Sequence, residues 1–148
     1  IFEDIILRIS KLCNVQYLLN RNINSLSGGE LKRVQLAKTL LQLYNPHSYN
    51  RKNKYALLDE PLANLDLFYE IEVLKIVRNV SRDQGIGIML IIHDLNLAAK
   101  FSNKIALLHS GEIKDYGKPK DVLRPSILKT IYKMNMKVQK NPFRVIHY

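Results

Sequence analysis

The chain has 148 residues, 47% of them hydrophobic, which is enough for one compact domain with its own core. This composition excludes a disordered chain, and no apolar run approaches the roughly 20 residues of a membrane-spanning helix. The formal net charge is +10, but lysines are spread from Lys11 to Lys140 without a dense basic block, so we expect no nucleic-acid binding. The chain begins with Ile1 and shows no secretory leader, so we expect no signal peptide, and the start is compatible with an incomplete reading frame.

The N-terminal third predicts two helices. Residues 2–19 have an amphipathic pattern, and Cys13 falls on the apolar side with Ile9 and Leu12, so we expect a core thiol rather than a reactive one. Residues 20–24 are polar and predict a turn. A second helix is predicted from Gly28 to Leu43, with two glycines at its start.

The rest of the chain alternates between strand and helix patterns. After a loop predicted at 44–54, we expect buried strands at 55–58 and 87–92, a third strand at 104–109 and a hairpin into 112–116. Helices are predicted at 66–81, 93–101 and 121–132, with a turn at 83–85 and a short extended tail at the end. This alternation is typical of the α/β class with a mainly parallel sheet.

Two carboxylates directly follow the apolar segment 55–58. Asp59 and Glu60 stand at the end of a predicted parallel strand, where open α/β sheets hold their ligands. Mg²⁺ in nucleotide sites is held by one or two carboxylates plus phosphate, and a neighbouring carboxylate can polarise a water for attack on a phosphoryl group. The alternative is a helix start at which the carboxylates cap backbone amides.

A histidine follows the next predicted strand. Because parallel strands end at the same edge of a sheet, we expect His93 to lie near Asp59 and Glu60. A neutral imidazole there can contact a terminal phosphate oxygen. The alternative is a histidine that only caps the end of the strand through local hydrogen bonds and has no role in a site.

Four motifs, in this order, resemble those of the ATP-binding cassette (ABC) ATPases. LSGGE at 26–30 is similar to their signature motif, YALLDEP at 55–61 to the Walker B strand, ANLD at 63–66 to the D-loop, and the strand ending at His93 to the switch-histidine segment. The resemblance implies the C-terminal part of an ABC-type P-loop NTPase domain. In that reading, residues 1–148 form a single partial domain, with the helical subdomain and signature helix at about 1–43 and the remainder at about 55–148.

The resemblance also implies cofactors and residue roles. ATP and Mg²⁺ would bind, with Asp59 holding the metal, Glu60 orienting the attacking water and His93 contacting the γ-phosphate. The signature residues Ser27, Gly28, Gly29 and Glu30 would bind the ATP of a second subunit, and Asp66 would join the two subunits. A helix N-terminus offers free N–H groups, and glycine lets a phosphate approach them closely.

The sequence also departs from the family pattern. Glu30 stands where many members have Gln, and Leu62-Ala63 replace the more usual Thr-Ser. The phosphate-binding loop GxxxxGK[ST] is absent from these residues, since Gly111 to Lys118 has one residue too many and precedes a proline. The Gln-containing loop and the adenine-stacking segment are also missing. We therefore expect the chain to begin inside the helical subdomain and to be inactive as an ATPase by itself.

Within the family, HDLNLAAKFSNKIALLHSGEI and YGKPKDVL resemble importer subunits for haem, cobalamin and iron chelates. LDLFYEIEVL and VQLAKTLLQL favour haem, whereas LNRNINSLSGGE and YKMNM favour cobalamin, and we favour haem. The family implies a homodimer that sandwiches ATP, membrane permease subunits, indirect action with a substrate-binding protein, and a peripheral location on the cytoplasmic face of the inner membrane.

Two other functions remain as alternatives. A cassette ATPase outside transport, such as a DNA-repair or translation factor, would carry a long coiled-coil insertion or a second cassette. An inactive truncated remnant would account for the absent phosphate-binding loop.

Overall fold

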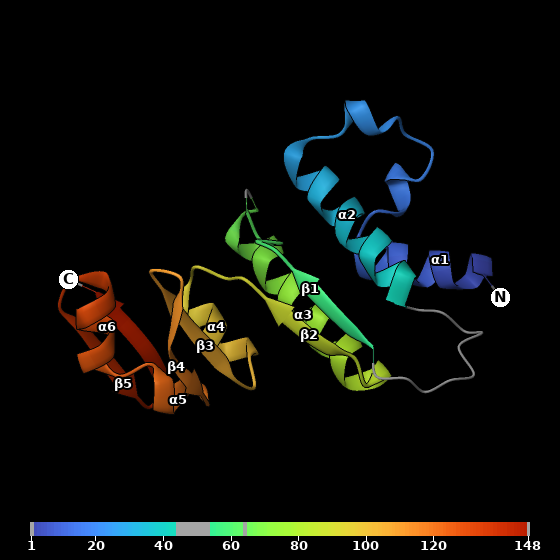
Figure 1. Cartoon of the computed structure of the whole chain (residues 1–148). Helices are drawn as coiled ribbons and strands as arrows, with labels where there is room; N and C mark the ends of the chain where they lie inside the picture. The colour runs from blue at the N-terminus through green and yellow to red at the C-terminus, as the bar shows by residue number, and fades with distance from the viewer. Residues whose placement is uncertain (1, 44–53, 64, 148) are drawn as a thin grey trace. The chain divides into compact units, whose positions relative to one another are not determined.

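The computed structural model describes residues 2–43, 54–63 and 65–147, so the predicted loop at 44–54 lies outside it except for Lys54. The chain divides into two compact units, residues 1–91 and 92–148, which are described separately (Figure 1). The prediction of one partial domain over 1–148 therefore stays a prediction. No helix in the described residues has the length and apolar character needed to cross a membrane.

The first unit opens with α1 (Phe2–Leu12), which contacts α2 (Gly28–Leu43). The prediction of one helix over 2–19 is wrong beyond residue 12. Asn14 adopts a left-handed conformation with φ 52°, and the Val15 amide reaches back to the Ser10 carbonyl at 2.9 Å. These two features are those of a helix C-cap, and they turn the chain away from the helix axis.

Two short 3₁₀ helices, η1 (Gln16–Leu18) and η2 (Ile23–Ser25), lead into α2. The start of α2 at Gly28 and its end at Leu43 confirm the predicted bounds. Ile9, Cys13, Leu36 and Leu40 are buried in this part of the unit, so the interpretation of Cys13 as a core residue is also confirmed.

A strand, a helix and a second strand complete the first unit. β1 (Tyr55–Leu58) pairs in parallel with β2 (Gly87–Leu90), and α3 (Leu67–Gln84) connects them and contacts β2 (Figure 1). Asp66 caps the start of α3, and Gly85, with φ 63°, ends it. A left-handed residue at this position is readily supplied by glycine, which explains the predicted turn.

The two strands are less buried than the sequence predicts. Leu58 is buried, but Leu57 and its register partner Met89 are 67% and 61% exposed, and Tyr55 is 74% exposed. Successive strand residues point to opposite faces, so only one face of a sheet can meet α3. The prediction of fully buried strands is therefore wrong for the opposite face, where Tyr55, Leu57 and Met89 are exposed.

The second unit begins with α4 (Leu95–Phe101), followed by β3 (Ile105–His109) and β4 (Glu112–Gly117), which pair as an antiparallel hairpin. The predicted turn at Ser110-Gly111 is confirmed, and both residues have positive φ, 52° and 77°. This is the conformation that twists a two-residue turn to match its strands.

The predicted helix at 121–132 is wrong because it is two helices, α5 (Pro119–Val122) and α6 (Pro125–Tyr132). Pro125 opens α6, and a proline disfavours the helical conformation of the residue before it, so Arg124 is extended with ψ 144°. Val122 from α5, Leu128 from α6 and Leu123 between these helices form the core of the unit with Leu107 and Val145.

The predicted extended tail is also wrong in part, since it forms a second antiparallel hairpin of β5 (Met136–Lys140) and β6 (Phe143–His147). Met136, Val138 and Phe143 pack against the core that contains Val145. The α/β class and the parallel β1–β2 pair agree with the sequence, and two antiparallel hairpins accompany that pair in the described residues.

Candidate functional site

The first turn of α2 is closed by a reciprocal pair of hydrogen bonds. The backbone N–H of Ser27 donates to Oε2 of Glu30 at 2.8 Å, and the backbone N–H of Glu30 donates to Oγ of Ser27 at 3.3 Å. This is the capping box that a Ser-x-x-Glu sequence can form, a signal already present in SGGE. A glutamate suits this position because either of its oxygens can accept the Ser27 amide, which gives Glu30 a local structural role.

The two glycines inside that box remain accessible. A Cβ added at Gly28 would meet no atom within 4 Å, and a Cβ at Gly29 would lie 3.7 Å from Cδ2 of Leu65. Among the described residues, neither glycine amide has a hydrogen-bond partner, as is usual in the first turn of a helix. The turn therefore presents two free N–H donors at the positive end of a 16-residue helix.

Glu30 is surrounded by donors. Besides the Ser27 amide, the Tyr17 hydroxyl lies 3.4 Å from Oε1, and Nη1 of Arg21 lies 3.8 Å from the same oxygen. The hydrogen bond from the Ser27 backbone is the main reason that the pKa of Glu30 lies below its ordinary value, and the Arg21 charge and the Tyr17 hydroxyl lower it further. Glu30 therefore stays ionised and keeps the first turn of α2 closed at neutral pH.

Asp59 and Glu60 follow β1 directly, and both side chains are exposed. Glu60 adopts a left-handed conformation with φ 44°, and its carbonyl accepts the Ala63 amide at 3.1 Å. A non-glycine residue in this conformation carries backbone strain, and such residues cluster at functional sites. The sequence placed Glu60 correctly at the end of the strand but did not indicate this turn.

Asp66 lies at the start of α3. Its Oδ1 accepts the Tyr69 backbone amide at 3.1 Å, and its carbonyl accepts the Glu70 amide at 2.9 Å. The residue before it, Leu65, approaches Gly29, so the structure brings the beginning of α3 next to the beginning of α2. Two of the motifs that the sequence identified separately therefore lie side by side in the first unit.

His93 belongs to the second unit, where it is exposed and precedes Asp94, the N-cap of α4. Oδ1 of Asp94 accepts the Leu97 amide at 2.8 Å. The expectation that His93 lies near Asp59 and Glu60 stays a prediction.

Metal binding has a candidate donor in the exposed carboxylate of Asp59. The described residues contain no cluster of three or more His, Cys, Asp or Glu side chains that could hold a metal ion. A Mg²⁺ ion that accompanies a nucleotide needs one or two carboxylates, because phosphates and waters supply the remaining ligands. Asp59, with Glu60 beside it in sequence, fits that donor set.

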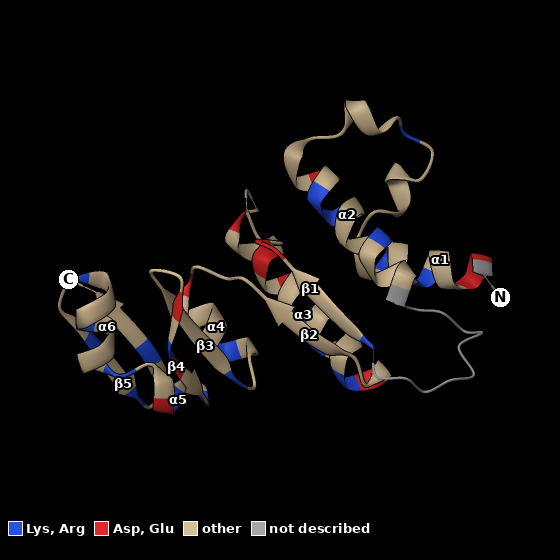
Figure 2. Cartoon of the chain, in the orientation of Figure 1, with Lys and Arg blue, Asp and Glu red and all other residues tan. Residues whose placement is uncertain are grey.

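Three residues that sequence reasoning missed lie beside this region. Arg33 on α2 is only 7% exposed, its Nη2 donates to the Tyr17 hydroxyl at 2.9 Å, and its guanidinium carbon lies 4.3 Å from the ring centroid of Tyr69. Tyr17, Arg33 and Tyr69 are far apart in the sequence, so no local pattern indicates that they are in contact. In the part of the chain that the structure describes, other basic residues occur in both units, on helices, on strands and in the segments between them (Figure 2).

Comparison with solved structures identifies the fold. A metal-chelate type ABC transporter in an inward-facing conformation matches with a TM-score of 0.79 and 22% identity, over 98% of this chain and 57% of that one. The dimeric structure of a bacterial ABC transporter cassette matches with a TM-score of 0.65 and 25% identity, over 78% of this chain and 46% of that one. No family model matches the chain.

The fold and the order of the motifs define a portion of an ABC-type ATPase cassette, and the chain belongs to the ABC ATPase family. Among curated proteins it is similar to the hemin import ATP-binding protein HmuV of Burkholderia thailandensis, with 45% identity over 129 residues, which are 87% of this chain and 47% of that protein. The chain spans about half the length of the curated relatives it matches.

Proposed function

We propose that this chain is part of the ATP-hydrolysing subunit of an ABC importer that takes up haem or a related iron chelate. The observation that carries the proposal is the start of α2, where two glycines with free amides lie beside the segment that leads into Asp66. Curated relatives named for hemin import support the cargo, and cobalamin is the second candidate.

The chemistry of the proposed site is phosphoryl transfer to water. Asp59 would hold Mg²⁺, which supplies positive charge at the phosphates when it is bound. Glu60 would accept a hydrogen bond from the attacking water and orient it, and His93 would donate to a γ-phosphate oxygen. The left-handed turn at Glu60 supports its role, because it directs the chain sharply at the end of β1.

The signature residues would act on a different ATP from that of their own subunit. The amides of Gly28 and Gly29 are directed away from α2 at its positive end, which suits a polyphosphate carried by a second copy. Asp66 would lie at the same subunit contact. Glu30 already accepts the Ser27 amide, so we propose that it shapes this turn rather than contacting ATP.

The remaining partners follow from the proposed role. A homodimer would sandwich ATP, membrane permease subunits would receive the energy of hydrolysis, and a substrate-binding protein would deliver the cargo to them. The chain would then act as a peripheral protein on the cytoplasmic face of the inner membrane.

The test uses the cassette encoded by the whole gene that contains this sequence, reconstituted with its permease. We expect haem to stimulate ATP hydrolysis, and Glu60→Gln to abolish turnover while ATP still binds, because the amide cannot accept a proton from water. Stimulation of ATP hydrolysis by cobalamin but not by haem would identify cobalamin as the cargo. Loss of ATP binding together with turnover in Glu60→Gln would instead mark Glu60 as a structural residue and count against the proposal.

The 148-residue chain by itself provides a matched negative control. Catalysis by positioning needs the phosphates to be held, and these residues contain no GxxxxGK[ST] loop. We expect its phosphate release from ATP to equal that of its own Glu60→Gln variant. Any Glu60-dependent release above that level would contradict this expectation.

A further inference from the structure

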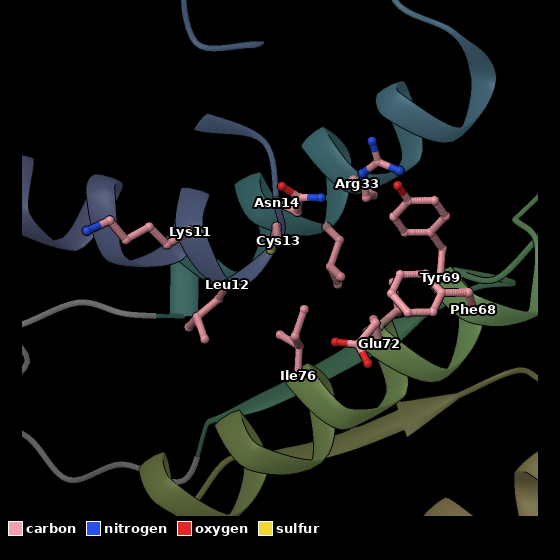
Figure 3. Close-up of a pocket in the computed structure, with 11 residues that line it drawn as sticks. Lys11, Leu12, Cys13, Asn14, Arg33, Phe68, Tyr69, Glu72 and Ile76 are labelled. Carbon is pink, nitrogen blue, oxygen red and sulfur yellow. The ribbon is translucent and has the colours of Figure 1, made fainter. Parts of the chain in front are cut away.

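A buried arginine connects the beginning of α2 to the beginning of α3. The guanidinium carbon of Arg33 lies 4.3 Å from the ring centroid of Tyr69. Figure 3 shows both side chains in a close-up of the surrounding pocket. Its Nη2 also donates to the hydroxyl of Tyr17 at 2.9 Å. One side chain on α2 thus contacts both η1 and the first turn of α3.

Arginine is specifically suited to this position. Its planar guanidinium can stack on an aromatic face while the edge of the same plane donates a hydrogen bond, which the compact ammonium of lysine cannot reproduce. Arg33 is 7% exposed, and its Nε has no hydrogen-bond partner among the described residues. In that part of the chain Arg33 forms no ion pair with a carboxylate, so its contacts with Tyr69 and Tyr17 fix where the head group of this buried cation can lie.

The contacts continue from Arg33 to the signature motif. The Tyr17 hydroxyl, which accepts from Arg33, donates to Oε1 of Glu30 at 3.4 Å. The other carboxylate oxygen of Glu30 accepts the Ser27 amide at 2.8 Å. The Arg33 head group is therefore linked through one hydroxyl to the hydrogen bonds that close the first turn of α2.

The contacts also continue in the other direction, to the D-loop. The ring of Tyr69 meets Arg33, and the backbone amide of Tyr69 donates to Oδ1 of Asp66 at 3.1 Å. A residue held at both its ring and its amide leaves the first turn of α3 little freedom to rotate about its own axis. Arg33 therefore acts on the same turn that Asp66 caps.

The contacts of Arg33 lie beside a cavity, which leaves fewer other contacts to hold the neighbouring helices in place. A pocket of about 260 Å³ opens between α1, α2 and α3, and its lining includes Leu12, Arg33, Leu36, Tyr69 and Ile76 (Figure 3). Side chains that line a cavity lose partner atoms on that side and restrain their helices less. The stacking of Arg33 on Tyr69 and the approach of Gly29 to Leu65 are contacts that cross from α2 to the start of α3.

We propose that Arg33 is a positioning residue that acts through Tyr69 and Tyr17. It holds the signature turn, which is the first turn of α2 at Ser27 to Glu30, and the D-loop turn, which is the first turn of α3 capped by Asp66, in a fixed relative orientation within one subunit. This inference rests on the proposed function, in which Ser27 to Gly29 and Asp66 meet the same partner subunit. Two turns that must dock on one surface bind more tightly when their mutual orientation is fixed beforehand.

The first test measures amide hydrogen exchange by NMR in the 148-residue chain, without nucleotide. The variants are Arg33→Lys, Tyr69→Leu and the double variant, and the matched control is Arg82→Lys, in which the exposed Arg82 pairs with its neighbour Asp83. Losing one net hydrogen bond or cation–π contact should accelerate exchange of the Ser27 and Glu30 amides by about three- to tenfold. Exchange of amides in α1 and β2 should stay unchanged, as should all exchange in the control.

The informative variant is Tyr69→Leu, because Tyr69 lies on α3 and the measured amides lie on α2. We also expect it to raise the pKa of Glu30 in a carboxyl NMR titration, and the double variant to show no larger effect than the stronger single one, as coupled residues do. Unchanged Ser27 and Glu30 exchange in a folded Tyr69→Leu variant would overturn the proposal, as would additive effects in the double variant.

These outcomes are independent of the proposed function. A whole-gene cassette that hydrolyses no ATP would refute the ATPase assignment and leave the exchange result intact. In an active cassette, Arg33→Lys should weaken ATP-driven dimerisation while ATP binding by the separate subunit is retained, because Arg33 does not touch the subunit's own proposed metal residue Asp59. Unaltered dimerisation in that cassette would overturn the positioning role even if the exchange effect were seen.

Discussion

Asn96 and Val145 exchange two hydrogen bonds across 49 residues of sequence. The Asn96 side-chain amide donates to the Val145 carbonyl at 3.1 Å, and its oxygen accepts the Val145 amide at 2.8 Å. A side chain of α4 thus satisfies both backbone groups of a buried residue on β6 and fixes the second hairpin to the core.

We expect Asn96→Ala to lower the free energy of unfolding by about 1 to 2 kcal/mol, because it leaves two partly buried backbone groups without partners. Urea denaturation followed by circular dichroism measures the change. Asn79→Ala is the matched control, since Asn79 is an exposed helix residue and the change in helix propensity is the same. Equal effects of both substitutions would mean that the hairpin is held by apolar packing alone.

The capping box at the start of α2 predicts a pH dependence. The folded-state pKa of Glu30 lies below its ordinary value of 4.5, so its ionised form contributes stability that is present above pH 4.5 and is lost as the pH falls through the folded-state pKa. We expect the stability difference between the wild type and Glu30→Gln to be constant at neutral pH and to shrink below pH 4.5. Denaturation curves at several pH values measure it.

The same box predicts the effect of removing its serine. Ser27→Ala should cost about 1 kcal/mol, since the Glu30 amide loses its partner at the helix start. Ser126→Ala is a useful comparison, because Ser126 is an exposed serine in the first turn of α6 that does not belong to the box. A destabilisation no larger than that of the comparison would show that the capping box contributes little in solution.

Burial predicts an inert thiol at Cys13. Desolvation raises its pKa from 9.0 to about 12, so the nucleophilic thiolate is scarce near neutral pH. Iodoacetamide at pH 8 should label the denatured chain and leave the native chain unmodified. The raised folded-state pKa also means that the contribution of Cys13 to stability is present below pH 9 and is lost as the pH rises toward 12. Rapid labelling of the native chain would show that this part of the core opens frequently.

A hybrid dimer tests whether the signature turn acts on the ATP of the other subunit. In the whole-gene cassette, Gly28→Asp places a carboxylate where a polyphosphate should arrive, and the resulting repulsion should block closure. Neither this variant nor Glu60→Gln should hydrolyse ATP as a homodimer. A hybrid of the two has one site that combines the intact Glu60 of one subunit with the intact Gly28 of the other.

We therefore expect the purified, differently tagged hybrid to recover phosphate release at a single site. If the signature turn served its own subunit, both sites of the hybrid would carry a defect. A hybrid as inactive as the two homodimers would then contradict action between subunits.

Local sequence determined the elements whose signals lie within a few residues. The bounds of α2 follow from the Ser27–Glu30 pattern and the apolar spacing after it, and the end of α3 follows from Gly85, which readily takes the left-handed conformation found there. The hairpin turn at Ser110-Gly111 has a similar local cause. The positions of Asp59 and Glu60 directly after β1 were also predicted locally, because the apolar run 55–58 ends where these two carboxylates begin.

Tertiary structure decided what depends on residues far apart in the sequence. The hairpin β5–β6 forms because Val145 is buried in a core and held by Asn96, although the alternation of Met136 and Val138 was a usable signal. The exposure of Leu57 and Met89 depends on which face of the sheet α3 covers. The link from Ser27 through Arg33 to Asp66 depends on the approach of two helices, and its energy comes from stacking and hydrogen bonds between residues that the sequence separates.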